Sequence, residues 1–446
     1  MDAPSDDPHS DDYTHEPVPL SERRGPVTMT LLWITMVTAF PTVLIGFQWY
    51  KQGLTLPQVL TCSLISCLFL LAYSVPAAWL GVRSGLTYAL LTRQTFGLVG
   101  TWIVSFNAIW LMSAWYALDS VLLADALKGL FSVNWSIPIF AAILSFVMAI
   151  NNYFGFKGVA NFARYFAAPL LVLWVAYTVC KVAPSITPTI MSAPGKVPFP
   201  TALTLVSSFV IGFAVWGNEP DYWRYGKANR THVFWSLAVS LMLGEIIFPA
   251  AGWMVAHLSG ITDYIAATNF MNDYSFGGIA IFAALVLIAN YFAANDSNMY
   301  GMINAVENLK KMPHRTAVFV LATASSIFAY CLALAGSSKS LESIASLNCI
   351  VIPVMTVIML VEEFVVKRHY ALTEDISRVI PLGELPRIRW PAFIAANVGL
   401  IFGILTSGII PGLESWYVGI CSVQSWLVAG VLYYALRAFE IKRAAN

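Results

Sequence analysis

Hydrophobic residues in this 446-residue chain gather in long runs, most of them about 20 residues in length. A run of that length can form a helix that crosses the hydrocarbon core of a bilayer. Twelve such runs are separated by more polar segments: 27–50, 54–80, 98–126, 136–155, 160–183, 198–218, 233–257, 276–299, 315–336, 345–366, 391–412 and 415–437. The pattern predicts an all-α polytopic membrane protein with 12 transmembrane helices.

The distribution of Lys and Arg predicts how these helices are oriented. With the N-terminus inside the cell, 20 of the 25 basic residues fall in cytoplasmic segments and 5 fall on the opposite side. An excess of basic residues in short loops marks the cytoplasmic side. We therefore expect a multi-pass protein of the cell (inner or plasma) membrane with both termini in the cytoplasm. The acidic first 26 residues lack a signal-peptide pattern and are interpreted as a cytoplasmic tail.

Composition argues against several other classes of protein. Hydrophobic residues make up 58% of the chain and charged residues 11%, and the net charge of +1 gives no reason to expect nucleic acid as a partner. The six cysteines lie singly in or beside apolar runs, and the six histidines lie in the tail, loops or helix ends, so we expect neither disulfides nor a metal site. No hydrolase, metalloprotease, Walker A or dinucleotide motif is present. We expect no enzyme activity and no cofactor.

Two predicted helices are irregular at corresponding positions. The first contains Pro41 in mid-membrane, and the sixth contains Gly212 and Gly217, followed by Pro220. Interrupted helices at equivalent positions of two halves point to a transporter site, and ordinary proline kinks are the alternative. A spacing of five helices suits two inverted five-helix repeats. The expected segments are a tail (1–26), two repeats (27–183 and 184–370), a cytoplasmic loop (371–390), two further helices (391–437) and a C-terminal tail (438–446).

Polar residues inside two of the helices are candidates for a binding site, because such residues are costly at membrane depth. Trp115 and Asp119 are four residues apart and share one helical face. The helix expected at 276–299 carries Asn290 and the polar segment 295–298. Two alternatives remain open: Trp115 and Asp119 are ordinary packed and hydrogen-bonded core residues, or the polar segment only ends its helix.

A further set of segments has a recognisable pattern: 12–20, 23–26, 96–97 with Trp102, 221–226, 295–300 and 352–354. These segments resemble the bacterial cytosine permeases of the nucleobase–cation symport family. They are spread over nearly the whole chain. The resemblance implies a LeuT-like fold of five plus five inverted-repeat helices, with two helices added at the C-terminus.

The resemblance also implies roles for individual residues. Trp115 matches a tryptophan that stacks on the substrate ring, and Asn295 matches an asparagine that bonds the base, with Asp296 as its neighbour. In the interrupted sixth helix, the stretch from Gly212 to Trp216 supplies backbone contacts and one aromatic side chain. Phe213 and Trp216 both remain candidates for that aromatic side chain.

Two further polar residues complete the expected substrate site. Asp119 lies where some relatives place a substrate-binding glutamine, and Asn298 follows in the polar segment. An aromatic ring binds the face of a planar heterocycle, while polar groups bind its edge. The carboxylate of Asp119 would accept a hydrogen bond from an exocyclic amine or a ring N–H, which favours cytosine, adenine or guanine over uracil.

The expected cation site departs from the family pattern. The resemblance places sodium between carbonyls of the first helix (Thr38 and Pro41), the carbonyl of Asn290 and two adjacent hydroxyls, which here fall on Ala293 and Ala294. Hard cations need several oxygen ligands, so we expect this sodium site to be lost. Proton coupling through Asp119 or Asp296 is the expected substitute, because burial favours the protonated form of a carboxyl group.

The expected function is therefore secondary-active import of a cytosine- or purine-like nucleobase by alternating access. The expected partners are this small molecule and the lipid bilayer. A transporter of the same fold for another small heterocycle, such as an allantoin- or hydantoin-like ring or a vitamin precursor, is one alternative. A membrane receptor that does not transport is the other.

Overall fold

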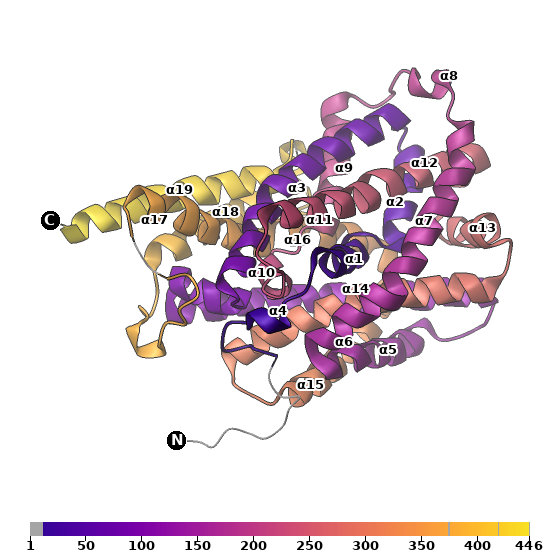
Figure 1. Ribbon diagram of the computed structural model, residues 1–446. Helices are drawn as coiled ribbons and strands as arrows, with labels where there is room; N and C mark the ends of the chain where they lie inside the picture. The colour runs from indigo at the N-terminus through magenta and orange to yellow at the C-terminus, as the bar shows by residue number, and fades with distance from the viewer. Residues whose placement is uncertain (1–11, 373–374, 418, 446) are drawn as a thin grey trace.

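The computed structural model describes residues 12–372, 375–417 and 419–445, so residues 1–11 of the predicted tail lie outside it. The described residues are largely helical and form no strand (Figure 1). The α-helices are α1 (Pro26–Val37), α2 (Phe40–Lys51), α3 (Leu56–Ser84), α4 (Tyr88–Phe131), α5 (Ile137–Val147), α6 (Gly155–Phe162), α7 (Ala168–Val182), α8 (Pro188–Met191), α9 (Phe199–Ala214), α10 (Glu219–Trp223), α11 (Arg230–Leu241), α12 (Phe248–Ser259), α13 (Tyr264–Phe276), α14 (Ala280–Leu309), α15 (His314–Ala335), α16 (Ser337–Val361), α17 (Lys367–His369), α18 (Trp390–Leu405) and α19 (Cys421–Ala445).

Shorter helical elements join several of these helices into longer rods. The 3-10 helix η2 (Met148–Phe154) and the π-helix η3 (Ala163–Ala167) connect α5, α6 and α7. The π-helices η5 (Met242–Ile247) and η6 (Glu362–Val366) join α11 to α12 and α16 to α17. The remaining 3-10 turns are η1 (Leu20–Glu22), η4 (Ala183–Ser185), η7 (Leu382–Glu384) and η8 (Glu414–Trp416).

The helices include several that are long and apolar enough to span a membrane. Among the described residues there are 7 such segments, and 8 if the bent pair α1 and α2 counts as one span. α9 and α18 are shorter apolar helices of 16 residues each. The protein is thus a multi-pass membrane protein, but helix length and composition do not confirm the predicted count of 12 spans. α9 is short because the chain leaves the helix after Ala214.

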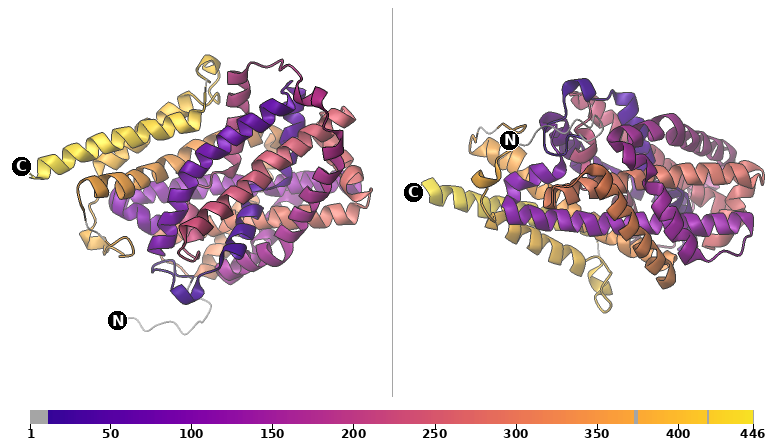
Figure 2. Two further views of the ribbon diagram at one scale, coloured as in Figure 1. Left: turned by 45° about the horizontal axis from the view of Figure 1, so that its top comes forward. Right: turned by 90° about the horizontal axis from the view of Figure 1, so that it is seen from below.

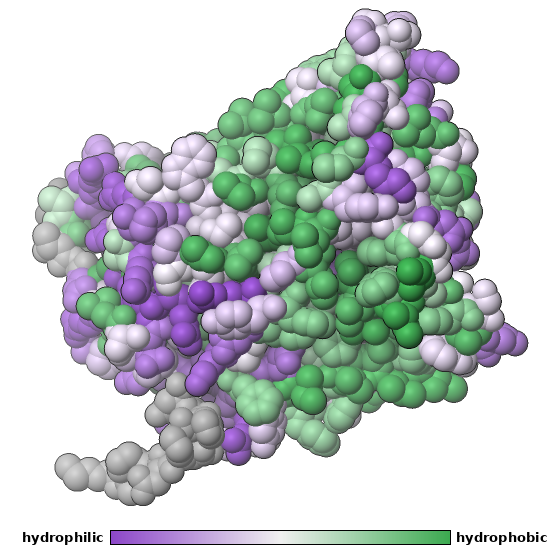
Figure 3. All heavy atoms as spheres, turned by 45° about the vertical axis from the view of Figure 1, so that its right-hand side comes forward, coloured by the Kyte–Doolittle hydropathy of each residue, from purple (hydrophilic) through white to green (hydrophobic). Residues whose placement is uncertain are grey.

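The outer surface and the two ends of the bundle fit a membrane environment. A broad apolar surface lies between hydrophilic margins in Figure 3. Large apolar side chains are exposed on the outside of the molecule, among them Leu173 (67%), Ile281 (71%) and Phe319 (63%), as expected where lipid replaces water. Figure 1 shows the C-terminal end of α19 on the side of the molecule opposite α8 and α13, and the views of Figure 2 also place this end at one edge of the molecule.

The first helix is interrupted where the sequence predicts it. α1 ends at Val37, Thr38 and Ala39 are extended, and α2 begins at Phe40, with an axis 45° away from that of α1. Pro41 occupies the first turn of α2, where the missing N–H has no helical partner to lose. Proline therefore starts the second half-helix rather than kinking a continuous one.

The sixth helix is interrupted in the same way. α9 ends at Ala214, and α10 begins only at Glu219. Between them Gly217 has a φ of +80°, a conformation that side chains disfavour, and a Cβ at this position would collide with the side chain of Ile352. A glycine is therefore required for the break to pack against α16.

Three helix boundaries differ from the sequence prediction. α14 begins at Ala280 and continues to Leu309, so the polar segment 295–298 lies in mid-helix instead of ending it. α4 begins ten residues earlier than expected and contains a non-helical Gly97. α19 continues to Ala445, so the segment expected as a C-terminal tail, 438–446, is helical in the residues described.

Candidate functional site

A small internal cavity lies beside both helix breaks. Its volume is about 30 Å³, and its walls come from α1, α4, α9, the α9–α10 break, α14 and α16. The lining residues are Met36, Met112, Trp115, Asp119, Phe213, Val215, Trp216, Ala294, Asn298 and Asn348. Five of the eight predicted substrate-site residues, namely Trp115, Asp119, Phe213, Trp216 and Asn298, therefore surround one space.

Aromatic rings form much of the wall of this cavity. Trp115 and Phe213 meet edge to face, with ring centroids 5.6 Å apart and an interplanar angle of 86°. Phe213 stacks in parallel on Phe209, one turn earlier in α9, at 5.5 Å. Phe209 in turn meets Trp49 of α2 edge to face at 6.1 Å. The four rings form a continuous series of contacts, called the aromatic ladder below. Edge-to-face contacts, such as two of the three in this series, are favoured by the quadrupoles of aromatic rings.

The polar groups of the cavity are few. The Asp119 side chain lines it and is only 4% exposed. The buried indole N–H groups of Trp115 and Trp216 have no hydrogen-bond acceptor among the described residues. A ligand with both donors and acceptors on its edge would find one carboxylate and two indole N–H donors here, beside the amide side chains of Asn298 and Asn348, whose Nδ2 atoms already donate within the protein. Buried polar groups are normally paired, so these groups are suited to bind a ligand.

Asn348 of α16 was not predicted from the sequence, although it lines the cavity. Its Nδ2 donates to the carbonyl oxygens of Gly212 and Val215, both at 2.8 Å. These carbonyls belong to the end of α9, where helical partners are missing. Gly212 itself does not line the cavity and contributes through this bond. A polar residue inside the apolar run 345–366 was the available signal.

Asn295 and Asp296 do not line the cavity. Asn295 Nδ2 donates to the Tyr116 carbonyl oxygen at 2.9 Å, and its Oδ1 accepts from Asn298 Nδ2 at 3.3 Å. Asp296 lies on the other side of α14 and accepts from Asn151 Nδ2 at 2.8 Å and Asn152 Nδ2 at 3.3 Å. In this structure Asn295 supports a cavity residue, and Asp296 joins α14 to η2.

The break in the first helix is held by Asn290 of α14. Asn290 Oδ1 accepts from the Phe40 N–H at 3.0 Å, and Asn290 Nδ2 donates to the Thr38 carbonyl oxygen at 2.9 Å. Ala293 and Ala294 are buried one turn further along and have no side-chain oxygen. An amide N–H directed at the Thr38 carbonyl, together with these two alanines, is a poor fit for a sodium ion, which needs several oxygen ligands.

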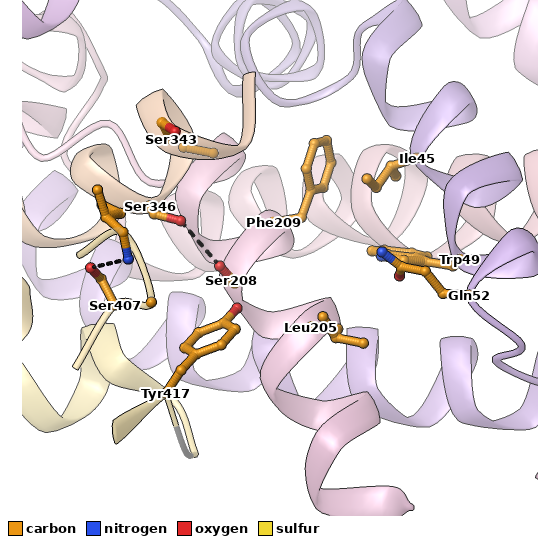
Figure 4. Close-up of a pocket in the computed structure, with 13 residues that line it drawn as sticks. Ile45, Trp49, Gln52, Leu205, Ser208, Phe209, Ser343, Ser346, Ser407 and Tyr417 are labelled. Carbon is orange, nitrogen blue, oxygen red and sulfur yellow. Dashed lines mark hydrogen bonds between the residues drawn. The ribbon is translucent and has the colours of Figure 1, made fainter. Parts of the chain in front are cut away.

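A larger cavity of about 190 Å³ lies beyond the aromatic ladder (Figure 4). Trp49 of α2 and Gln52, the residue that follows α2, line one side. Ser346 of α16 lines another, 3.4 Å from Ser208 of α9 between their Oγ atoms. Phe209 belongs to this outer cavity, whereas Phe213 belongs to the inner one. The two stacked phenylalanines therefore separate the outer cavity from the inner cavity.

The other side of the inner cavity is closed by buried polar and aromatic side chains. Tyr222 of α10 meets Trp216 edge to face at 5.7 Å and donates to the Ser297 carbonyl oxygen at 2.8 Å. Arg224 is fully buried and donates to the carbonyl oxygens of Tyr13 at 2.5 Å and Asp12 at 2.7 Å. Asp12 and Tyr13 of the N-terminal tail thus pack under this layer.

Comparisons with known proteins agree with this architecture. The sequence matches the family described as permease for cytosine/purines, uracil, thiamine, allantoin over residues 17–428. It is 23% identical to the cytosine permease of Escherichia coli (strain K12) over 413 residues, which cover 90% of each chain. It is 22% identical to a putative purine-cytosine permease of Bacillus subtilis (strain 168) over 470 aligned positions, covering 97% of each chain.

Solved structures show the same fold. A nucleobase-cation-symport-1 family transporter in a closed conformation with bromovinylhydantoin bound has a TM-score of 0.74 at 18% identity, with 96% of each chain covered. A Na⁺-coupled sialic acid symporter in a substrate-bound outward-open state has a TM-score of 0.62 at 14% identity, with 96% of this chain and 93% of that chain covered. The chain therefore belongs to the family of membrane permeases for cytosine, purines, uracil, thiamine and allantoin.

Proposed function

We propose that this permease is a secondary-active importer of a cytosine- or purine-like nucleobase that works by alternating access. The observation that carries the proposal is the inner cavity, where two tryptophans, a phenylalanine and the single carboxylate of Asp119 surround one space beside both helix breaks. A planar base has a stacking face and an edge of donors and acceptors, which such a set of groups complements. The names of the cytosine and purine-cytosine permeases it resembles support the same substrate class.

The proposed architecture is 12 spans in two inverted five-helix repeats plus two C-terminal helices, in the cell membrane with both termini cytoplasmic. The matching interruptions in α1–α2 and α9–α10 support the repeat. The count of 12 follows if α1–α2, α9, α18 and α19 are added to the seven long segments and the 49-residue segment Ile137–Ser185 is counted as two spans.

We propose that Asp119 binds the polar edge of the base. While it carries the coupled proton, its carboxyl group still accepts through the carbonyl oxygen from an exocyclic amine or a ring N–H, and the indole N–H groups of Trp115 and Trp216 supply donors. A site built to bond specific groups discriminates strongly against an analogue that lacks them. Bases with an exocyclic amine should therefore be preferred to uracil.

We propose that transport is coupled to protons instead of sodium. The Asn290 amide bonded to the Thr38 carbonyl supports this, as do the alanines at 293 and 294. Asp119 is favoured over Asp296 as the proton carrier because Asp119 faces the cavity, whereas Asp296 is bonded to Asn151 and Asn152. A proton bound to the carboxyl group of Asp119 would face first the outside and then the inside of the cell together with the substrate, as coupled transport requires.

A second candidate substrate is a five-membered ring of the allantoin or hydantoin type. The position of Asn295 outside the cavity lining supports this candidate, because the asparagine expected to bond a nucleobase is then not among the groups that line the cavity. Both candidates share the face-stacking and edge-bonding chemistry, so the panel of ligands in the experiment must include both.

The deciding experiment is uptake into proteoliposomes with labelled cytosine, adenine, uracil, allantoin and hydantoin. Each ligand is tested with an inward proton gradient in sodium-free buffer and with a sodium gradient at constant pH. Proton-driven uptake of an amine-bearing base is expected. Sodium-dependent uptake that ignores the pH gradient would contradict the proposed coupling, and ligand binding without counterflow would identify a receptor instead.

A further inference from the structure

A long groove of about 820 Å³ runs along the membrane-facing side of the bundle, away from the site described above. Its walls are α3, the segment from α16 to α17, and α19, and Arg230 and Val233 from the first turn of α11 also line it. The groove therefore joins elements that are far apart in the sequence. It shares no lining residue with the inner cavity.

One end of this groove is strongly basic. Arg83, Arg230, Lys367 and Arg368 line it, and Glu363 is the single acidic residue among the lining residues. Glu363 lies 2.9 Å from Lys367 and 3.9 Å from Arg83, so one carboxylate is shared between two cations. Four cations against one anion leave this end with a surplus of positive charge.

The guanidinium of Arg230 is held in place at the same end. It lies over the ring of Trp79, 5.0 Å from the ring centroid. Tryptophan and arginine are typical of the membrane–water interface, where an amphipathic ring and a snorkelling side chain reach the headgroup level. The basic end of the groove thus has the residue types that are typical of protein surfaces at the level of the lipid headgroups.

The rest of the groove is apolar and open to the bilayer. Phe69 of α3 is 40% exposed, and Leu427 of α19 is 61% exposed. Phe69 and Arg83 are 14 residues apart on one helix, which corresponds to a length of about 21 Å. This exceeds the half-thickness of a hydrocarbon core, which is about 15 Å. The apolar part is therefore long enough to hold an acyl chain along its full depth in one leaflet.

We propose that this groove is a binding site for one anionic phospholipid. Its phosphate would lie among Arg83, Arg230 and Arg368, and one acyl chain would lie along the apolar wall between α3 and α19. The charge surplus selects an anionic headgroup over a zwitterionic one. Basic pockets between helices on the cytoplasmic side are known to take such headgroups, and the basic end is on the side predicted to be cytoplasmic.

The lipid would connect elements that are far apart in the sequence. α3 and α11 contribute the cations Arg83 and Arg230, and α17 contributes Lys367 and Arg368. A headgroup that bridges these cations would stabilise their present spacing. The occupied groove should therefore raise the thermal stability of the purified chain, whatever substrate the permease carries.

The test is a lipid titration of the purified full-length chain in a neutral detergent. Dioleoyl-phosphatidylglycerol and dioleoyl-phosphatidylcholine are added separately, and melting temperature and the number of bound lipids (by native mass spectrometry) are recorded. The anionic lipid is expected to bind more tightly and to raise the melting temperature more. Equal effects of the two lipids would overturn the proposal.

Variants locate the effect in the groove. Arg230→Gln with Arg368→Gln should weaken binding of the anionic lipid by about fivefold per charge, or about 25-fold together. Arg230→Lys with Arg368→Lys should retain most of the binding, and Lys310→Gln with Lys311→Gln, outside the groove, should behave like wild type. Unchanged binding in the double Gln variant would overturn the proposal, as would a dimer that occupies the groove in place of lipid.

Discussion

The Asn290 side chain donates through Nδ2 to the carbonyl oxygen of Thr38, 2.9 Å away, across the interface between α14 and the break in the first helix. The same side chain accepts from the N–H of Phe40 on the far side of the break. One neutral amide thus pairs two backbone groups that the interruption leaves without helical partners. A cation is not needed to hold this break.

Asn290→Ala should destabilise the protein because the Thr38 carbonyl and the Phe40 N–H would be left buried and unpaired. Each unsatisfied group costs about 1–3 kcal/mol. The melting temperature should fall by the same amount in sodium and in choline buffers. Asn397→Ala is the matched control, since that exposed side chain bonds only within its own helix. A fall in stability that sodium reverses would show that a cation binds here after all.

Hydroxyl groups can be introduced at positions 293 and 294 to test whether the Asn290 amide prevents sodium from binding. Ala293→Ser with Ala294→Thr adds two oxygens, but the Thr38 carbonyl stays paired with Asn290, so little sodium dependence is expected. Adding Asn290→Ala to this pair frees that carbonyl. Only the triple variant should gain stability from sodium, measured as a shift in melting temperature. Strong sodium stabilisation of the double variant would show that Asn290 does not block the site.

Trp115→Ala should weaken substrate binding. Stacking of a base on an aromatic side chain contributes about 1–3 kcal/mol, so the affinity should fall about 5- to 150-fold. Trp115→Phe should retain much of it, and Trp110→Ala is the control because Trp110 bonds to Asn107 and does not line the cavity. Binding is measured with the ligand that the uptake panel identifies. An equal loss in Trp110→Ala would point to a general packing defect.

Parts of this site could be predicted from the sequence because they follow from helical periodicity. Trp115 and Asp119 share a face by their spacing, and both line the cavity. Asp296 was misplaced because periodicity defines faces relative to one another, but only the packing of neighbouring helices decides which face meets the cavity. Asn348 was missed for the same reason: its partners, the carbonyls at the end of α9, lie more than 130 residues away in the chain.

Asp119→Asn should separate substrate binding from proton coupling. The asparagine cannot take up or release a proton, so uptake driven by an inward proton gradient should be lost, while exchange of internal for external substrate persists. Wild-type uptake should increase as the external pH falls, because the carboxyl group must be protonated on the outside. Asp296→Asn should keep the wild-type pH profile. If Asp296→Asn alone abolished the pH dependence, the proton carrier would be Asp296.

Arg224→Gln should release the N-terminal tail from the closed side of the cavity. Arg224 donates to the carbonyl oxygens of both Asp12 and Tyr13, and hydrogen bonds from a charged donor contribute about 1.5–3 kcal/mol each. Backbone amides of residues 12–25 should then exchange faster with deuterated water, whereas those of α18 should not change. Lys227→Gln is the control, because Lys227 is exposed next to the same segment. Unchanged exchange in Arg224→Gln would mean that the Tyr225 hydroxyl, which donates to Asp12 Oδ1 at 2.7 Å, suffices to hold the tail.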